Sequence, residues 1–129
     1  PDGSQKDGFL KYGKGRPAGV FDAERAAYVP FSEIAERCDE RLGVLPEQAK
    51  PWRVVIQDPD RAKFLDGFFK RLRQMDTLGA RLARQYGQRS KVIGLGLVKD
   101  RVAGRAEDVN TVLLTGFYHA YGPINDYFD

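Results

Sequence analysis

The residues best suited to chemistry gather near the C-terminus, in the segment TGFYHAYGPINDYFD. His119 is the chain's single histidine, and Tyr118, Tyr121 and Asn125 lie within six residues of it. One histidine and one distant cysteine do not provide the three or four ligands of a zinc site. We therefore expect no metal ligand here. These four residues are candidates for a substrate cleft or an interface, or they form a turn that pivots on Gly122-Pro123.

Nucleophilic catalysis would require His119 to meet a serine held in an elbow motif. Ser32 and Ser90 lie in no such motif. Cys38 is flanked by acids that discourage a thiolate, so a structural thiol is expected. We predict no catalytic residue in the chain, and a small enzyme that uses His119 is the weakest of the readings.

A second candidate is SKVIGLGLVKD, residues 90–100, in which Gly94 and Gly96 match the start of a dinucleotide-binding G-x-G-x-x-G loop. That loop needs a preceding strand, a third glycine and a following helix. Lys99 occupies the third glycine position, and the preceding residues are charged and helical in pattern. We therefore predict a helix in which Gly94 and Gly96 permit a close crossing by another helix, and no cofactor-binding residue.

The elements that position these residues are mostly helical. The pattern predicts a bundle of about five helices preceded by a short loop and a β-hairpin over residues 19–31. Helices are expected over residues 32–43 with Ser32 as cap, from about Pro51, from Asp58 or Asp60 to Met75, from Thr77 to about Val102, and from 104 to 116. Residues 1–30 are read as an N-terminal extension or linker and residues 31–129 as the helical domain.

Two of these helices have clear apolar stripes. The first stripe comprises Phe64, Leu65, Phe68, Leu72 and Met75, a set typical of core. The second comprises Leu78, Leu82, Tyr86, Ile93 and Leu97, and another face of that helix holds Arg81, Arg84, Gln88 and Lys91.

Composition places the chain among soluble single domains, with 129 residues, 42% hydrophobic and 30% charged. A single cysteine excludes an internal disulfide and favours a reducing, cytoplasmic setting. The absence of a run of 18 apolar residues argues against a membrane partner. Residues 51–105 hold 13 Lys/Arg against 5 Asp/Glu, yet the net charge of +3 favours solvated helix faces over nucleic-acid binding. The start at Pro1 suggests a segment of a longer protein.

Both ends of the chain resemble one family. The segment GLVKDRVAGRAEDVNTVLLTGFYHAYGPINDYFD is similar to the helical C-terminal domain of 3-hydroxyacyl-CoA dehydrogenases, through Leu97–Ala103, Glu107–Asn110, Gly116 and Gly122-Pro123. KDGFLKYGKG, residues 6–15, and the hairpin that follows resemble the end of one helical domain and the linker to a second. Asn110 replaces the family's usual second Asp, and the first glycine of the N-terminal signature is missing.

The resemblance implies the second of two tandem helical domains, of the 6-phosphogluconate-dehydrogenase C-terminal type, in an NAD-dependent enzyme of fatty-acid β-oxidation. NAD and the catalytic residues would belong to an upstream dinucleotide-binding domain, so this chain would hold no cofactor itself. Its partners would be that domain, the acyl-CoA substrate and a possible second copy. The alternative is a free-standing helical module that binds protein or nucleic acid through the basic helices of residues 61–91.

Overall fold

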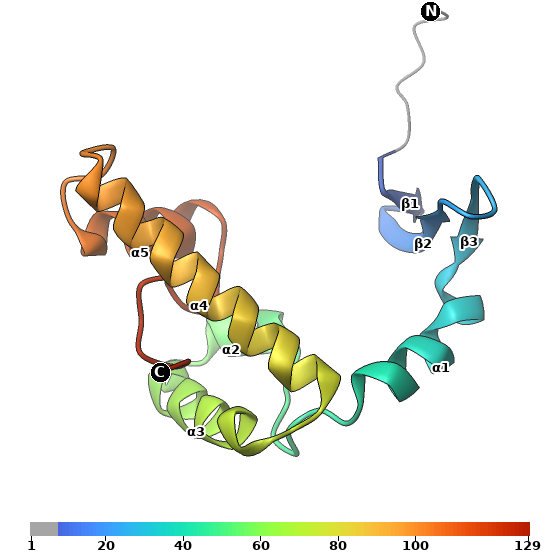
Figure 1. The fold of residues 1–129 in the computed structure, drawn as a ribbon, viewed down its shortest axis with the longest axis horizontal. Coiled ribbons are helices and arrows are strands. Elements are labelled where there is room, and N and C mark those ends of the chain that lie inside the picture. The colour runs from blue at the N-terminus through green and yellow to red at the C-terminus, as the bar shows by residue number, and fades with distance from the viewer. Residues whose placement is uncertain (1–7) are drawn as a thin grey trace, which may run out of the picture. The chain divides into compact units, whose positions relative to one another are not determined.

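The computed structural model describes residues 8–129 and is mostly helical, as predicted (Figure 1). Internal contacts group the chain into two compact units, one ending at Arg41 and one spanning Leu42–Asp129. The predicted domain boundary at residues 30/31 stays a prediction. Lys6 and Asp7 of the N-terminal signature lie outside the described residues. The described elements are β1 (Leu10–Gly13), β2 (Arg16–Asp22), β3 (Ala27–Pro30), α1 (Phe31–Leu42), α2 (Trp52–Gln57), α3 (Arg61–Gln74), α4 (Leu78–Lys99) and α5 (Ala106–Gly116).

The first unit is an antiparallel meander, β1-β2-β3, followed by α1. The predicted hairpin is confirmed as β2 and β3. In the turn between them, the Asp22 carboxylate accepts hydrogen bonds from the backbone amides of Glu24 (2.9 Å) and Arg25 (3.2 Å). The prediction of a loop before this hairpin is wrong in part, because residues 10–13 form β1, which pairs with β2. Gly19 is required where the strands meet, since a Cβ there would lie 2.4 Å from the Val29 carbonyl oxygen.

Helix α1 begins one residue earlier than predicted, at Phe31, so Ser32 lies inside the helix rather than at its cap. Its C-terminal end is as predicted, because Gly43 follows with a φ of +81°, a conformation that favours glycine. Two further helix starts follow local chemistry. Pro51 precedes α2, and the Thr77 hydroxyl accepts a hydrogen bond from the Ala80 amide at the start of α4 (3.2 Å).

In the second unit the core lies among α2, α3, the first turns of α4 and the C-terminal end. Its buried members are Val55, Leu65, Phe69, Leu72, Ala80 and Phe128. The predicted α3 stripe is therefore incomplete, because Phe69 is its most central member and was not included. The Phe69 ring lies 4.8 Å from Tyr127, 4.8 Å from Phe128 and 5.0 Å from Tyr121, centroid to centroid.

Helix α4 is the long helix of this unit, and both α3 and α5 contact it (Figure 1). The face that it buries is not its apolar stripe. Its buried residues are Ala80, Gly87 and Gly94, seven residues apart, whereas Leu82, Tyr86 and Ile93 are exposed. Small residues are buried on this face because bulky side chains from the C-terminal end of the chain occupy the space against it.

Candidate functional site

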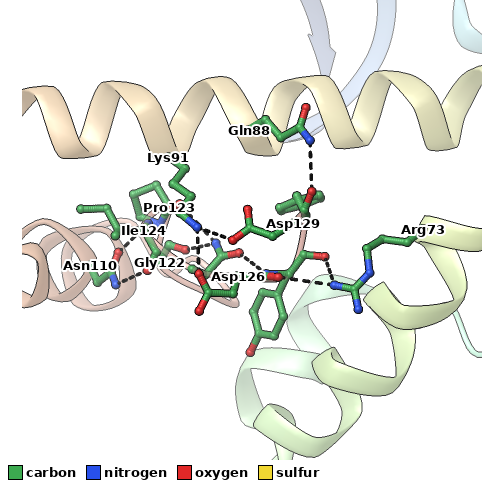
Figure 2. A network of polar contacts seen from close by, with 12 residues as sticks. Arg73, Gln88, Lys91, Asn110, Gly122, Pro123, Ile124, Asp126 and Asp129 are labelled. Carbon is green, nitrogen blue, oxygen red and sulfur yellow. Dashed lines mark hydrogen bonds and ion pairs between the residues drawn. The ribbon is translucent and has the colours of Figure 1, made fainter.

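The C-terminal segment, residues 117–129, crosses the second unit and is bonded to three helices (Figure 2). Its attachment to α5 is the Asn110 side chain. The amide NH2 donates to the Ile124 carbonyl (2.9 Å), and the amide oxygen accepts from the Ile124 N–H (3.0 Å). Gly122 is needed beside it, because a Cβ there would lie 2.2 Å from Asn110. The two motif stretches of the C-terminal resemblance are thus in direct contact.

Asn125 organises the turn after Gly122-Pro123. Its NH2 group donates to the carbonyl oxygens of Gly122 (2.6 Å) and Pro123 (3.2 Å), and its side-chain oxygen accepts from the Tyr127 amide (2.9 Å). An asparagine whose donors and acceptor serve the backbone builds a turn. The structure therefore accounts for Asn125 as a turn residue whose side chain is half-buried.

Three polar side chains from α3 and α4 hold the end of the chain. Arg73 donates to the Tyr127 carbonyl (2.8 Å), and Gln88 donates to the Phe128 carbonyl (3.1 Å). Lys91 forms ion pairs with the side-chain carboxylates of Asp126 (2.8 Å) and Asp129 (2.6 Å), as Figure 2 shows. The hydrogen bond and charge of Lys91 lower the pKa of Asp126, and hydrogen bonds to the two carboxylates raise the pKa of Lys91.

Beneath this segment lies a cavity of about 210 Å³, bounded by α4, α5 and the loop after α5. Most of its wall is apolar, and the polar side chains that line it include Ser90, His119, Tyr121 and Asn125. The full lining is Tyr86, Gly87, Ser90, Ile93, Gly94, Leu97, Val109, Leu113, His119, Tyr121, Pro123 and Asn125. Such a cavity suits an apolar group with a few polar atoms.

The predicted site residues are brought together in part. His119, Tyr121 and Asn125 line the cavity, whereas Tyr118 is absent from its wall and is 67% exposed. Burial raises the pKa of Tyr121, whose ring packs on Phe69, so this hydroxyl stays protonated at neutral pH. Tyr118 has a φ of +54°, a left-handed conformation that turns the chain before His119.

The glycine pair within residues 90–100 lies inside α4, as predicted, and not in a phosphate loop. The two glycines differ in surroundings. A Cβ at Gly94 would lie 2.8 Å from Ile124 and 3.6 Å from Val109, whereas one at Gly96 would meet nothing within 4 Å. The close crossing expected at both positions therefore exists only at Gly94, and its main neighbour is the C-terminal segment.

A second, larger cavity of about 430 Å³ lies between the 43–50 loop, α2, α3 and the start of α4. Trp52, Phe64 and Phe68 line it, and Tyr86 and Tyr121 line both cavities.

The sequence analysis did not identify Gly87, Gln88 and Lys91 as the residues of α4 that contact the C-terminal segment. The available signal was the repeat of small residues every seven positions, from Ala80 through Gly87 to Gly94.

Comparison with known proteins finds no protein family, no curated protein and no solved structure that matches this chain. Between residues 8 and 129, no helix has both the length and the apolar character needed to span a bilayer. Within that range, no three histidine, cysteine or acidic side chains gather as a metal site would require.

Proposed function

We propose that this chain is a helical substrate and assembly domain of an NAD-dependent 3-hydroxyacyl-CoA dehydrogenase, of the 6-phosphogluconate-dehydrogenase C-terminal type. The observation that supports it is the contact of Asn110 with Ile124. This contact joins the Glu107–Asn110 stretch to the Gly122-Pro123 stretch, which carry much of the family resemblance. Two patterns that lie apart in the sequence thereby form one structural unit over a cavity.

The G-x-G pattern at Gly94 and Gly96 does not form a dinucleotide loop. A dinucleotide needs free backbone amides at a strand–turn–helix junction, and Gly94 and Gly96 instead lie within the C-terminal part of α4. The proposal therefore places NAD, the catalytic residues and hydride transfer in an upstream domain. The role of this chain would be to supply an apolar wall for the acyl group of the thioester and a surface on which the upstream domain closes.

Isothermal titration with NAD and, separately, with a medium-chain acyl-CoA tests the proposal. We expect no heat with NAD and weak binding of the acyl-CoA. Leu113→Trp, which fills the smaller cavity from α5, should weaken the acyl-CoA binding, and the neighbouring exposed Val112→Ala should leave it unchanged. Micromolar NAD binding, or acyl-CoA binding that is absent or indifferent to Leu113→Trp, would overturn the proposal.

The nucleic-acid alternative is less well supported, because several cationic side chains of residues 61–91 bond to carbonyl or carboxylate groups of the second unit. Arg73 and Arg84 donate to backbone carbonyls, and Lys91 and Arg81 pair with carboxylates. Contacts with phosphates need available cationic side chains, which replace the counterions bound to the nucleic acid. Binding of DNA or RNA at low salt that weakens as salt rises would favour this alternative.

A further inference from the structure

The sheet of the first unit has two faces, and α1 lies against one of them. Leu10 pairs with Val20 and Val20 pairs with Val29, so these three side chains form a row on one face. Val20, Val29 and Ile34 of α1 line one hollow, and Val29 is buried. Because successive side chains of a strand alternate between faces, the residues next to this row lie on the opposite face.

The opposite face of the sheet has an aromatic row, with one ring from each strand or its start. The Phe9 carbonyl accepts a hydrogen bond from the Phe21 amide (3.0 Å), and Phe21 pairs with Tyr28. The Phe21 and Tyr28 rings lie 5.4 Å apart, centroid to centroid, in an edge-to-face arrangement. Phe9 is 72% exposed and Phe21 is 39% exposed. These two rings therefore offer much of their surface to a partner.

Cationic side chains continue the same face toward the turn between β1 and β2. Lys11 follows Phe9 on this face, and its Nζ lies 5.3 Å from the centroid of the Tyr28 ring. Arg16 pairs with Gly13, which lies two residues after Lys11, so Arg16 falls on this face as well. The face thus combines aromatic rings with positive charge.

Charge is divided between the two ends of the three-stranded sheet. Lys14 lies in the turn between β1 and β2, beside Arg16, and both side chains are exposed. The acidic residues of the strands and their turns, Asp22 and Glu24, lie at the other end, where the Asp22 carboxylate already binds turn amides. A phosphate group that approaches the first turn therefore meets cations and no carboxylate of the sheet.

We propose that this face binds a single strand of nucleic acid, with bases stacked on Phe9 and Phe21 and phosphates in contact with Lys14 and Arg16. The inference goes beyond the proposed enzymatic role and does not depend on it. Sheets that bind RNA stack two or three bases on aromatic side chains, and every base offers such a π-face. From Phe21 to Arg16 is roughly 17 Å along β2 at 3.3 Å per residue. A site of about four nucleotides, the low end for single-strand binding, should cover this length.

This surface is separate from the basic helices of residues 61–91 that the alternative function would use. Bases of a duplex are stacked on one another, so their faces are not available to Phe9 and Phe21. Binding through phosphate charge alone does not need exposed base faces. A preference for single strands over duplex therefore distinguishes the sheet from the basic helices.

Fluorescence anisotropy of a labelled single-stranded DNA of eight nucleotides, titrated with the 129-residue chain at low salt, provides the first test. Phe9→Ala should weaken binding roughly fivefold to a hundredfold, the range for one stacked base, and Phe9→Trp should retain it. The matched control is Tyr12→Ala, because Tyr12 is 60% exposed on the other face of the same strand. Absence of binding, or equal affinities of Phe9→Ala and Tyr12→Ala, would overturn the proposal. Unchanged circular dichroism establishes that each variant is folded.

The salt dependence of the same titration tests the phosphate contacts. For single strands, each contact contributes about 0.7 to the slope of log K against log salt concentration. Arg16→Gln should therefore reduce the slope by about 0.7. The control is Arg89→Gln, an exposed position on α4 within the basic helices, which should leave the slope unchanged. The opposite result for these two variants, or a duplex bound as tightly as the single strand, would assign binding to the basic helices and refute the proposal.

Discussion

Two glycines of α4 should respond to alanine in opposite directions. At Gly96 a methyl group meets nothing within 4 Å, so Gly96→Ala gains the higher helix propensity of alanine, up to about 1 kcal/mol of unfolding free energy. At Gly87 the new Cβ would lie 2.3 Å from Cε2 of Phe128. A comfortable carbon contact is roughly 3.5–4 Å, so the ring must move by more than about 1 Å.

Phe128 cannot move freely, because Gln88 holds its carbonyl and the ring packs against Phe69. Overpacking of this kind costs about 1–3 kcal/mol, and loss of a buried phenylalanine's packing costs about 3–5 kcal/mol. After subtraction of the roughly 1 kcal/mol gained in helix propensity, we expect Gly87→Ala to lower the free energy of unfolding by about 2 kcal/mol. The two variants should therefore differ by about 3 kcal/mol.

Urea unfolding followed by far-UV circular dichroism measures this difference, with equal m-values for the two variants and the parent. Gly96→Ala is the matched control, since it makes the same chemical change in the same helix. A Gly87→Ala variant as stable as the parent would show that the C-terminal segment does not pack on α4 as described. A Gly96→Ala variant less stable than the parent would refute the open surroundings of that residue.

Two further predictions concern the attachment of the C-terminal segment. Asn110→Ala removes both hydrogen bonds to the backbone of Ile124 and should lower the free energy of unfolding by about 1–3 kcal/mol in the same urea assay, with exposed Val112→Ala as control. Lys91→Met should reduce stability at neutral pH but not in acid. The pKa of Asp126 is lowered in the folded chain, so its contribution is present above the unfolded pKa, about 3.9, and is lost as pH falls through the folded value. Thermal unfolding curves of parent and variant should begin to converge as pH falls below about 4 and should coincide only below the lowered pKa of Asp126, and a constant difference across pH would contradict the assigned pair.

The sequence alone determined the helices, the hairpin and most of their ends, because those features follow from local chemistry. Gly43 ends α1 and Pro51 precedes α2 through backbone preferences that any chain with those residues shares. The helical nature of residues 90–99 was equally predictable, since Lys99 and the charged residues before it disagree with a phosphate loop. His119, Tyr121 and Asn125 lie close together in the sequence and line one cavity in the structure.

Only the tertiary structure decided which side of α4 is buried. By hydrophobicity the Leu82 face should be core, yet Gly87 and Gly94 face the interior. The reason is that Phe128 and Ile124, which lie 41 and 30 residues further along the chain, need space that only glycine leaves. Burial depends on a partner surface that periodicity does not describe. The same distant packing makes Phe69 central to the core and leaves Leu82, Tyr86 and Ile93 exposed.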